Sequence, residues 1–349
     1  MKSLSIGTFR IGPDERCFIL AEAGVNHNGS VELAKELVSA ALEAGADAVK
    51  FQTFQADKLA TPDAEMADYQ RRNTRDHSNQ YNMLRQLELT HEEFIELKSY
   101  TDSKGGLFLS TPHDEESADF LERLDVPCFK IASGDVPNVG FLRRVALKGK
   151  PIILSTGMAY LGEVEAAVQA IEQTGNNNLS LLHCVSDYPA QPVFCNLRAM
   201  DTLTQAFGYP VGFSDHTLGF EVTLAAVARG ARLIEKHLTL DRTMPGPDHK
   251  ASLNPAEFAA MAKAVRVVEA ALGDGVKKPV SAELDIRAAV RKSVVSARPI
   301  PAGRVIVAED LTLRRSSGGL DPAYMTVIIG RKLRREVDVN SVINLDLLV

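Results

Sequence analysis

The sequence predicts an α/β protein: a closed (β/α)8 barrel of the TIM type followed by a small, irregular β domain. Eight short apolar runs alternate with segments of helical period between residues 18 and 272. These runs are almost continuously apolar, as in parallel strands that are buried on both faces. The last stretch is β-branched and punctuated by proline and glycine. We expect a catalytic barrel over residues 1–272, a linker over 273–292 and the small domain over 293–349.

Composition is consistent with a folded protein of this kind. Of the 349 residues, 45% are hydrophobic and 24% charged, close to the globular average. The net charge of −6, with no long basic run, disfavours nucleic acid as a partner. No apolar stretch approaches the roughly 18 residues of a membrane helix, and no signal peptide is evident. The four cysteines are scattered without a CxxC pair, which is typical of a reducing compartment, so we expect a cytoplasmic protein without membrane partners.

The expected elements follow one another as strand and helix. The helix over Ser30–Ala44 has a capping serine at its start and Gly45 at its end. The helix over Pro255–Leu272 has apolar residues at three- and four-residue steps and stops at Gly273. Leu59–Thr90 is polar and too long for an ordinary connection, so we expect an irregular functional loop at the barrel mouth. The eight expected strands are Phe18–Val25, Ala46–Phe54, Gly106–Pro112, Pro127–Ser133, Pro151–Gly157, Leu179–Val185, Pro210–His216 and Leu233–Thr239.

A faint internal repeat at an offset of 37 residues organises the C-terminal domain. Ile300–Ile306 aligns with Val337–Ile343, and Glu309–Leu311 aligns with Asp346–Leu348. Gly303 and Asn340, which both tolerate positive φ, fall at matching positions and predict the same turn. A pseudo-symmetric module of this size has little core of its own and is expected to lean on something larger.

Polar side chains lie at or near the ends of all eight expected strands, and in a (β/α)8 barrel these ends meet at one mouth. Lysine and glutamate in buried strands need partners, which favours an active site over a purely structural barrel. The polar residues are Glu22, Asn26, His27, Lys50, Gln52, Ser110, Thr111, Lys130, Ser133, Ser155, Thr156, His183, Ser214, Asp215, His216, Glu235, Lys236 and His237.

Lys50 and Lys130, surrounded by hydroxyl groups, suggest a small anionic substrate that carries phosphate or carboxylate. The alternative is that the two lysines form structural ion pairs with Glu22 and Glu235. Even then, their charges would shape the mouth of the barrel.

His216 and His237 end adjacent strands, so their imidazoles are candidates to hold one divalent ion. Two nitrogen ligands leave positions for water and substrate, which suits Mn²⁺ or Mg²⁺ better than a closed zinc site. We interpret His27 and His183 as hydrogen-bonding struts, and Cys184 as a buried apolar filler. Further along the chain, Tyr188 and the loop over residues 244–250 present more polar groups, although that loop could also be a plain surface turn.

Nine short strings, in order, make the sequence resemble the sialic acid synthase family. They begin with Ala21–Gly29, and the C-terminal domain resembles the antifreeze-like (SAF) domain of the same family. The other strings are Val49–Thr53, Leu109–Pro112, Phe129–Gly134, Ile153–Met158, Leu182–Cys184, Phe213–Thr217, Ile234–His237 and Pro245–His249.

The resemblance implies condensation of phosphoenolpyruvate with an open-chain N-acyl mannosamine-type sugar. The products would be N-acetylneuraminate or N,N'-diacetyllegionaminate and phosphate, with cleavage of the phosphoenolpyruvate C–O bond. It implies Mn²⁺ or Mg²⁺ on His216 and His237, with Glu22 and Glu235 as catalytic groups. Phosphoenolpyruvate would be bound by Lys50, Gln52, Thr111, Lys130, Ser133 and Ser155, and the sugar by Ser186, Tyr188 and Asp248.

The resemblance also implies a domain-swapped homodimer, in which an arginine of the SAF domain reaches the partner's sugar site. Arg315 matches that arginine, with Arg314 as the neighbouring candidate. The family usually continues Arg-Pro-Gly-x-Gly, whereas Ser316 and Ser317 follow here, so the turn loses its stiffening proline. Ser186 also stands where some relatives have asparagine.

Two other functions remain open at this point. One is a phosphoenolpyruvate-dependent synthase acting on a related sugar or a sugar phosphate, such as one of the pseudaminate type; a sugar phosphate would call for a second basic cluster. The other is a degenerate barrel that binds carbohydrate without catalysis, which the full set of strand-end residues disfavours.

Overall fold

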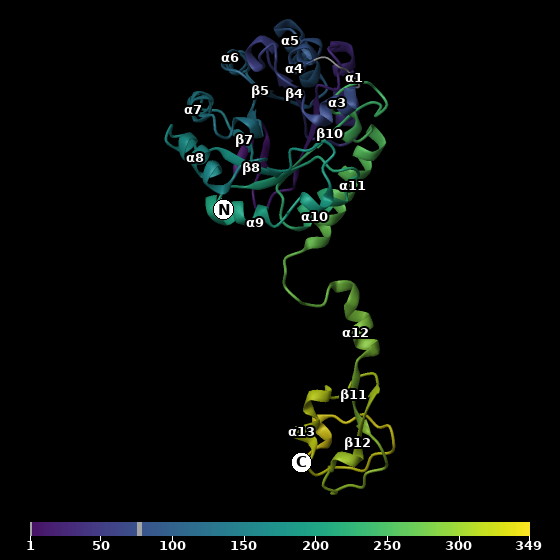
Figure 1. Ribbon diagram of the computed structural model, residues 1–349. Helices are drawn as coiled ribbons and strands as arrows, with labels where there is room; N and C mark the ends of the chain where they lie inside the picture. Colours follow the sequence, from purple (N-terminus) through teal and green to yellow (C-terminus); the bar gives the residue numbers. More distant parts are fainter. Residues whose placement is uncertain (1, 75–78) are drawn as a thin grey trace. The chain divides into compact units, whose positions relative to one another are not determined.

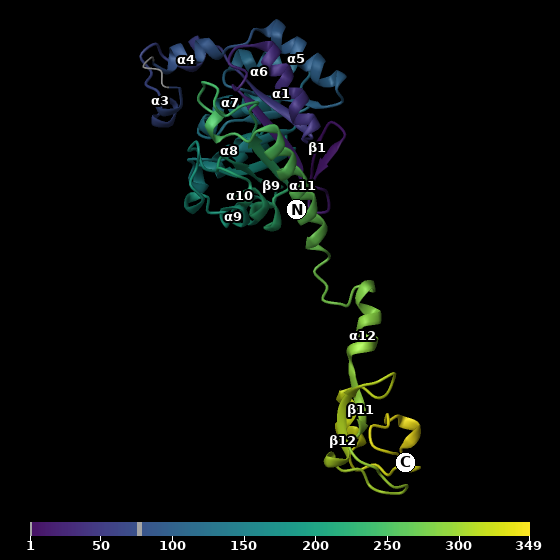
Figure 2. The same ribbon diagram turned by 90° about the vertical axis from the view of Figure 1, so that its right-hand side faces the viewer.

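The structure, a computed structural model, describes residues 2–74 and 79–349. It divides into two compact units, Met1–Gly273 and Asp274–Val349, which are described separately (Figures 1 and 2). Within the described residues, no helix is long and apolar enough to cross a membrane.

The first unit is a closed barrel of eight parallel strands, as predicted from the continuous apolar runs. Each strand pairs with its neighbours in sequence, and β10 closes the barrel against β3. The strands are β3 (Phe18–Gly24), β4 (Ala48–Thr53), β5 (Leu107–Pro112), β6 (Phe129–Ile131), β7 (Ile152–Ser155), β8 (Leu179–Cys184), β9 (Val211–Asp215) and β10 (Leu233–His237). All eight expected strands are therefore present, each somewhat shorter than its apolar run.

A ring of helices covers the outside of the barrel, as Figure 1 shows. Ser30 caps α1 by accepting a hydrogen bond from the Leu33 amide, and Gly45 follows the helix with a φ of +92°. Asn254 caps α11, and Gly273 ends it with a φ of +64°. The helices are α1 (Val31–Glu43), α5 (His91–Ser103), α6 (Glu115–Arg123), α7 (Val139–Leu147), α8 (Leu161–Glu172), α9 (Ala199–Phe207), α10 (Glu221–Ala228) and α11 (Pro255–Leu272).

An N-terminal hairpin of β1 (Leu4–Ile6) and β2 (Phe9–Ile11) covers the end of the barrel where the strands begin. Its side chains Leu4, Ile6 and Ile11 are fully buried, and Phe9 is partly buried, against inward-facing residues from the first half of the strands. The sequence analysis missed this hairpin, although its alternating pattern around Gly7, which has a φ of +57°, is a recognisable signal.

The expectation of an irregular loop over Leu59–Thr90 was wrong for about half of its length. The structure has α2 (Ala56–Leu59), α3 (Asp68–Thr74) and α4 (Gln80–Leu87) in this region, and residues 75–78 lie outside the described part. The reason is a separate apolar cluster in which Met66, Met83 and Leu87 pack on Val25 and Phe54 of the barrel. The segment is polar and has few apolar residues, so the spacing of its apolar residues does not indicate this packing.

The C-terminal unit has its own apolar core, which includes Val294, Ile300, Ile306 and Ile343. It contains α12 (Leu284–Val290), the antiparallel pair β11 (Lys292–Ser296) and β12 (Leu311–Arg315), and α13 (Met325–Ile328).

The 37-residue repeat is confirmed in this unit. Gly303 and Asn340 have φ of +77° and +66°. The 3-10 turns η5 (Ala308–Asp310) and η7 (Leu345–Leu347) also fall at the same offset, and the two repeats meet through an antiparallel bridge between Ile300 and Val337.

Candidate active site

A cavity of about 590 Å³ opens at the carboxyl ends of the barrel strands. All the barrel residues to which the resemblance assigns a role line it, which brings together side chains from every strand or the loop after it. They are Glu22, Lys50, Gln52, Thr111, Lys130, Ser133, Ser155, Ser186, Tyr188, His216, Glu235, His237 and Asp248. Seven of the other polar residues expected at the strand ends do not line it: Asn26, His27, Ser110, Thr156, His183, Asp215 and Lys236. The remaining candidate, Arg315, lies in the C-terminal unit, where it ends β12 and is exposed.

The two buried lysines each lie between a carboxylate and a hydroxyl group. Lys50 Nζ is 2.8 Å from Glu22 Oε2 and donates a hydrogen bond of 3.0 Å to Thr111 Oγ1. Lys130 Nζ donates a hydrogen bond of 2.7 Å to Ser155 Oγ and is 3.5 Å from Glu235 Oε2. The ion-pair alternative for these lysines is therefore realised in the structure, and it places both cations on the floor of the cavity.

The two carboxylates of this charge cluster have pKa values shifted in opposite directions. Burial raises the pKa of Glu22, although Lys50 opposes the shift. Burial acts the same way on Glu235, but the ammonium groups of Lys130 and Lys50 outweigh it and hold its pKa at about 2. Glu235 is therefore ionised near neutral pH, whereas Glu22 is the better proton acceptor.

His216 and His237 meet at the mouth, with ring centroids 5.4 Å apart. The Nδ1 of His216 is 2.6 Å from the Val185 carbonyl, which can only accept, so this nitrogen carries the proton. Ser214 donates its single proton to Glu235 over 2.9 Å, although its oxygen is also 3.2 Å from His216 Nε2. The lone pair on that Nε2 is therefore left without a donor.

The second imidazole is also available for binding. The Nδ1 of His237 is buried and has no hydrogen-bond partner. Burial lowers the pKa of both histidines, so both rings are neutral, which is the form that binds metal ions. Within residues 2–74 and 79–349 no group of three or more His, Cys, Asp or Glu forms a ready metal cluster, so the histidine pair fits only an ion that keeps water or substrate ligands.

Tyr188 lies against both imidazoles, with its ring centroid 4.2 Å from that of His216 and 5.5 Å from that of His237. On its other side it contacts Tyr69, at 4.9 Å. Tyr69 comes from α3, and the sequence analysis missed it because its segment was expected to be irregular. The helix thus contributes an aromatic side chain directly to the cavity.

Asp248 enters the cavity from the loop after β10, and this loop is anchored rather than a plain surface turn. His249 Nδ1 is 2.7 Å from Thr239 Oγ1, and the Asn73 amide donates a hydrogen bond of 2.7 Å to the Pro247 carbonyl. Burial raises the pKa of Asp248 to about 7, with a smaller contribution from Glu22. The carboxyl group can therefore donate or accept a hydrogen bond near neutral pH.

Gly157 lies against Ser133, Cys184 and Ser186, three residues that line the cavity. Its amide donates a hydrogen bond of 2.9 Å to Ser133 Oγ. A β-carbon at this position would be 2.5 Å from Ser186 Oγ and 3.0 Å from Ser133 Oγ. Only glycine leaves both hydroxyl groups in place.

His27 and His183 form the hydrogen bonds that were expected of them, and Cys184 is the expected buried apolar residue. His183 Nε2 is 2.7 Å from the Cys195 carbonyl, and His27 Nδ1 accepts from the Gly29 amide at 3.1 Å. Cys184 is buried, and its burial raises the pKa of its thiol, so it is not an activated nucleophile. His113 is a cavity residue that the sequence analysis did not identify.

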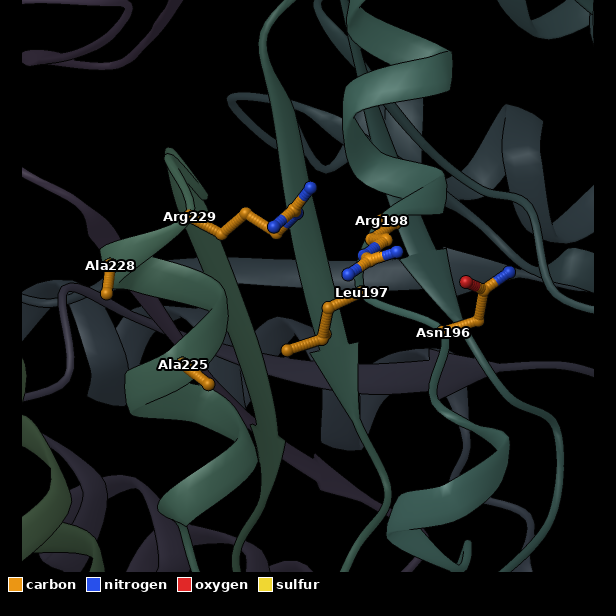
Figure 3. Close-up of a pocket in the computed structure, with 6 residues that line it drawn as sticks. All are labelled: Asn196, Leu197, Arg198, Ala225, Ala228 and Arg229. Carbon is orange, nitrogen blue, oxygen red and sulfur yellow. The ribbon is translucent and has the colours of Figure 1, made fainter.

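A second hollow, of about 750 Å³, lies at the outer surface beside α9 and α10. Figure 3 shows Arg198 and Arg229 extending from opposite sides of it. Both arginines are exposed, and Arg229 already pairs with Asp201. Its lining has no convergent set of buried polar groups, unlike the cavity at the strand ends.

The fold and the site together define a TIM-barrel synthase joined to an SAF domain. The chain belongs to the NeuB family, whose model matches residues 37–277, and the SAF domain model matches residues 291–349. The resemblance to sialic acid synthases is thereby confirmed, and the chain is an enzyme of that kind.

Three relatives illustrate the similarity. The chain is 47% identical to N,N'-diacetyllegionaminic acid synthase of Legionella pneumophila, covering 95% of this chain and 94% of that one. It is 43% identical to the synthase of the same name from Campylobacter jejuni, covering 91% and 96%. Among solved structures, N-acetylneuraminic acid synthetase of Leptospira borgpetersenii in complex with citrate superposes with a TM-score of 0.73 at 35% identity, covering 82% of this chain and 96% of that one.

Proposed function

We propose that this synthase joins phosphoenolpyruvate to an open-chain N-acyl mannosamine-type sugar and releases phosphate by C–O cleavage. The observation that carries the proposal is the convergence of two buried ammonium groups with two neutral imidazoles in one cavity. The ammonium groups suit a carboxylate and a phosphate, and the imidazoles suit a divalent ion.

Phosphoenolpyruvate would be held by the floor of the cavity. Lys50 and Lys130 supply charge, and the hydroxyl groups beside them orient the remaining oxygens. The binding residues are Lys50, Gln52, Thr111, Lys130, Ser133 and Ser155.

His216 and His237 would hold Mn²⁺ or Mg²⁺, because each offers an unprotonated or unpartnered nitrogen at the mouth. A bound ion supplies polarisation of the sugar aldehyde and orientation of water. Tyr188 packs on both rings and keeps their orientation fixed.

The π electrons of phosphoenolpyruvate form the new C–C bond to the aldehyde carbon, and the aldehyde oxygen takes up a proton. Water then adds to the former enol carbon, and the C–O bond to phosphate breaks, leaving a 2-keto acid. Glu22, with its raised pKa, would take the proton from this water, whereas Glu235 stays ionised and orients Ser214 beside His216.

The sugar would lie between Ser186, Tyr188 and Asp248 and the helices α3 and α4. That side of the cavity combines six apolar residues with Tyr69, Gln70 and Gln80, and among the described lining residues the only lysines are Lys50 and Lys130. Such a wall suits the methyl groups of a 6-deoxy-2,4-diacetamido sugar, as the relatives' name N,N'-diacetyllegionaminic acid synthase would require, better than a 6-hydroxyl or a 6-phosphate group. The apolar lining consists of Val25, Leu59, Ala67, Met83, Leu84 and Leu87.

The proposal includes a homodimer in which Arg315 of one SAF domain meets the N-acyl group in the partner's cavity. Large apolar side chains in the loops after β7, β8 and β9 are strongly exposed, which is typical of a surface that another chain covers. They are Met158, Tyr160, Val193, Phe194 and Leu218. A cytoplasmic location belongs to the same proposal, and it agrees with four scattered cysteines that form no CxxC pair.

The experiment is phosphate release from phosphoenolpyruvate labelled with ¹⁸O at the bridging oxygen, with Mn²⁺ present. Three sugars are compared: N-acetylmannosamine, its 6-phosphate and the 6-deoxy-2,4-diacetamido analogue. The expected result is labelled phosphate, fastest with the diacetamido sugar and absent in the Lys130→Met variant. A pseudaminate-type stereoisomer as the best substrate would revise the sugar, unlabelled phosphate would refute C–O cleavage, and no release with any sugar would refute the proposal.

A further inference from the structure

A third buried ion pair lies directly behind the candidate metal site, on the outer side of the barrel strands. Asp215 Oδ2 is 3.1 Å from Lys236 Nζ, and both side chains are 0% exposed. Neither residue lines the cavity, so the reaction proposed above makes no use of them.

All the polar atoms of this pair have partners. Asp215 accepts hydrogen bonds from the amide and hydroxyl of Thr217, at 2.9 and 2.7 Å, and from Thr223 Oγ1 of α10 at 2.6 Å. Lys236 Nζ donates to the Thr217 carbonyl at 2.6 Å. The pair therefore ties β9, β10 and α10 together around one residue, Thr217.

The pair lies at the point where the β-sheet pairing between β9 and β10 ends. Lys236 and Asp215 are the last paired residues between β10 and β9. Because side chains alternate along a strand, their neighbours His216 and His237 face the cavity while the pair faces α10. In the described part of the chain, no β9–β10 pairing continues beyond this point: the His216 carbonyl accepts from the Ala190 amide and the His237 carbonyl from the Leu253 amide, each at 2.9 Å.

A buried ion pair is weak support for stability, since well-packed neutral residues often serve as well. The hydrogen bonds of Asp215 and Lys236 with Thr217 act at a more specific place. They link the residues on both sides of His216 to Lys236, which precedes His237. We propose that Asp215 and Lys236 are positioning residues that set the separation of the two metal-binding imidazoles. This inference rests on the proposed metal role of those histidines.

The test uses the full-length double variant Asp215→Asn/Lys236→Met, which removes both charges and nearly keeps the side-chain shapes. Binding of Mn²⁺ is measured from the electron paramagnetic resonance signal of the free ion. We expect a Kd weakened about 10- to 100-fold, the usual range for groups that orient metal ligands. The thermal unfolding midpoint and the KM for phosphoenolpyruvate should stay close to wild type.

The matched control is Asp47→Asn. Asp47 is also a buried carboxylate beside the barrel, paired with Arg16 at 2.6 Å and Arg266 at 3.3 Å, but it precedes β4 and lies far along that strand from the mouth. This variant should be less stable and should keep wild-type Mn²⁺ affinity. If Asp215 and Lys236 had only a structural role, the double variant would also be less stable and would keep wild-type Mn²⁺ affinity.

Each outcome decides one question. Wild-type Mn²⁺ affinity in the folded double variant overturns the positioning role alone. If His216→Ala and His237→Ala bind Mn²⁺ as well as wild type does, the metal assignment fails and the inference fails with it. Should the double variant not fold, Thr223→Val deletes a single hydrogen bond to Asp215, and about fivefold weaker Mn²⁺ binding is then expected.

Discussion

Removing Lys50 tests how one buried cation serves both folding and substrate binding. Lys50 is 2.8 Å from Glu22, and their side chains are only 4% and 2% exposed. Lys50→Met leaves the Glu22 carboxylate buried without its cation, which typically costs about 3–5 kcal/mol of stability. Under the proposed binding mode it also removes one charge-assisted hydrogen bond to phosphoenolpyruvate, worth about 1.5–3 kcal/mol, which corresponds to roughly 10- to 150-fold in affinity.

A second variant separates the two effects. In Glu22→Gln/Lys50→Met neither charge remains, so most of the lost stability should return while phosphoenolpyruvate affinity stays low. Stability is followed by urea unfolding with circular dichroism, since the chain has no tryptophan, and affinity by calorimetric titration without sugar. Lys148→Met, which removes a lysine paired with Asp119 outside the site, is the control and should bind phosphoenolpyruvate normally. Wild-type affinity in Lys50→Met would refute the assignment of Lys50.

Three further outcomes are expected. Burial raises the pKa of Asp310, but the Val307 amide and two arginines outweigh it, so its folded pKa is lowered. The ionised Asp310 should therefore stabilise the C-terminal unit above about pH 4, and this stabilisation should be lost as the pH falls below that value. Thermal unfolding of Asp310→Asn should depend less on pH. Gly157→Ala should lower kcat/KM about tenfold or more with little change in Tm, because the new methyl group displaces the Ser186 and Ser133 hydroxyl groups and the Cys184 thiol but no backbone; unchanged kinetics would contradict the close approach. Mixing inactive Arg315→Ala and His237→Ala chains should restore part of the activity in heterodimers, and heterodimers shown to form without activity would place Arg315 in its own subunit's site.

The barrel could be predicted from the sequence because its signals are local. A parallel strand buried on both faces must be apolar along its length, so runs such as Leu179–Cys184 identify themselves. Helix ends are local in the same sense, as Ser30 and Gly273 show. The matching turns at Gly303 and Asn340 also depend only on the residue at each position.

The helices near the mouth could not be predicted in this way. The helix α3 has few apolar residues of its own, and the region is held by Met66 and Met83, which pack on barrel residues distant in sequence. For that reason Tyr69, which completes the aromatic contact with Tyr188, was missed. The contribution of a residue like this depends on a partner more than one hundred positions away.

By itself, the sequence determined most of the strand residues that line the cavity, such as Lys50, Lys130 and Glu235, because strand positions and strand direction follow from local pattern. Only the tertiary structure decided that Lys50 faces Glu22, that Ser214 donates to Glu235 and leaves His216 Nε2 open, and that the two carboxylates differ in pKa. These properties depend on distances of a few ångströms between different strands and on exclusion of water, and no stretch of a single strand encodes either one.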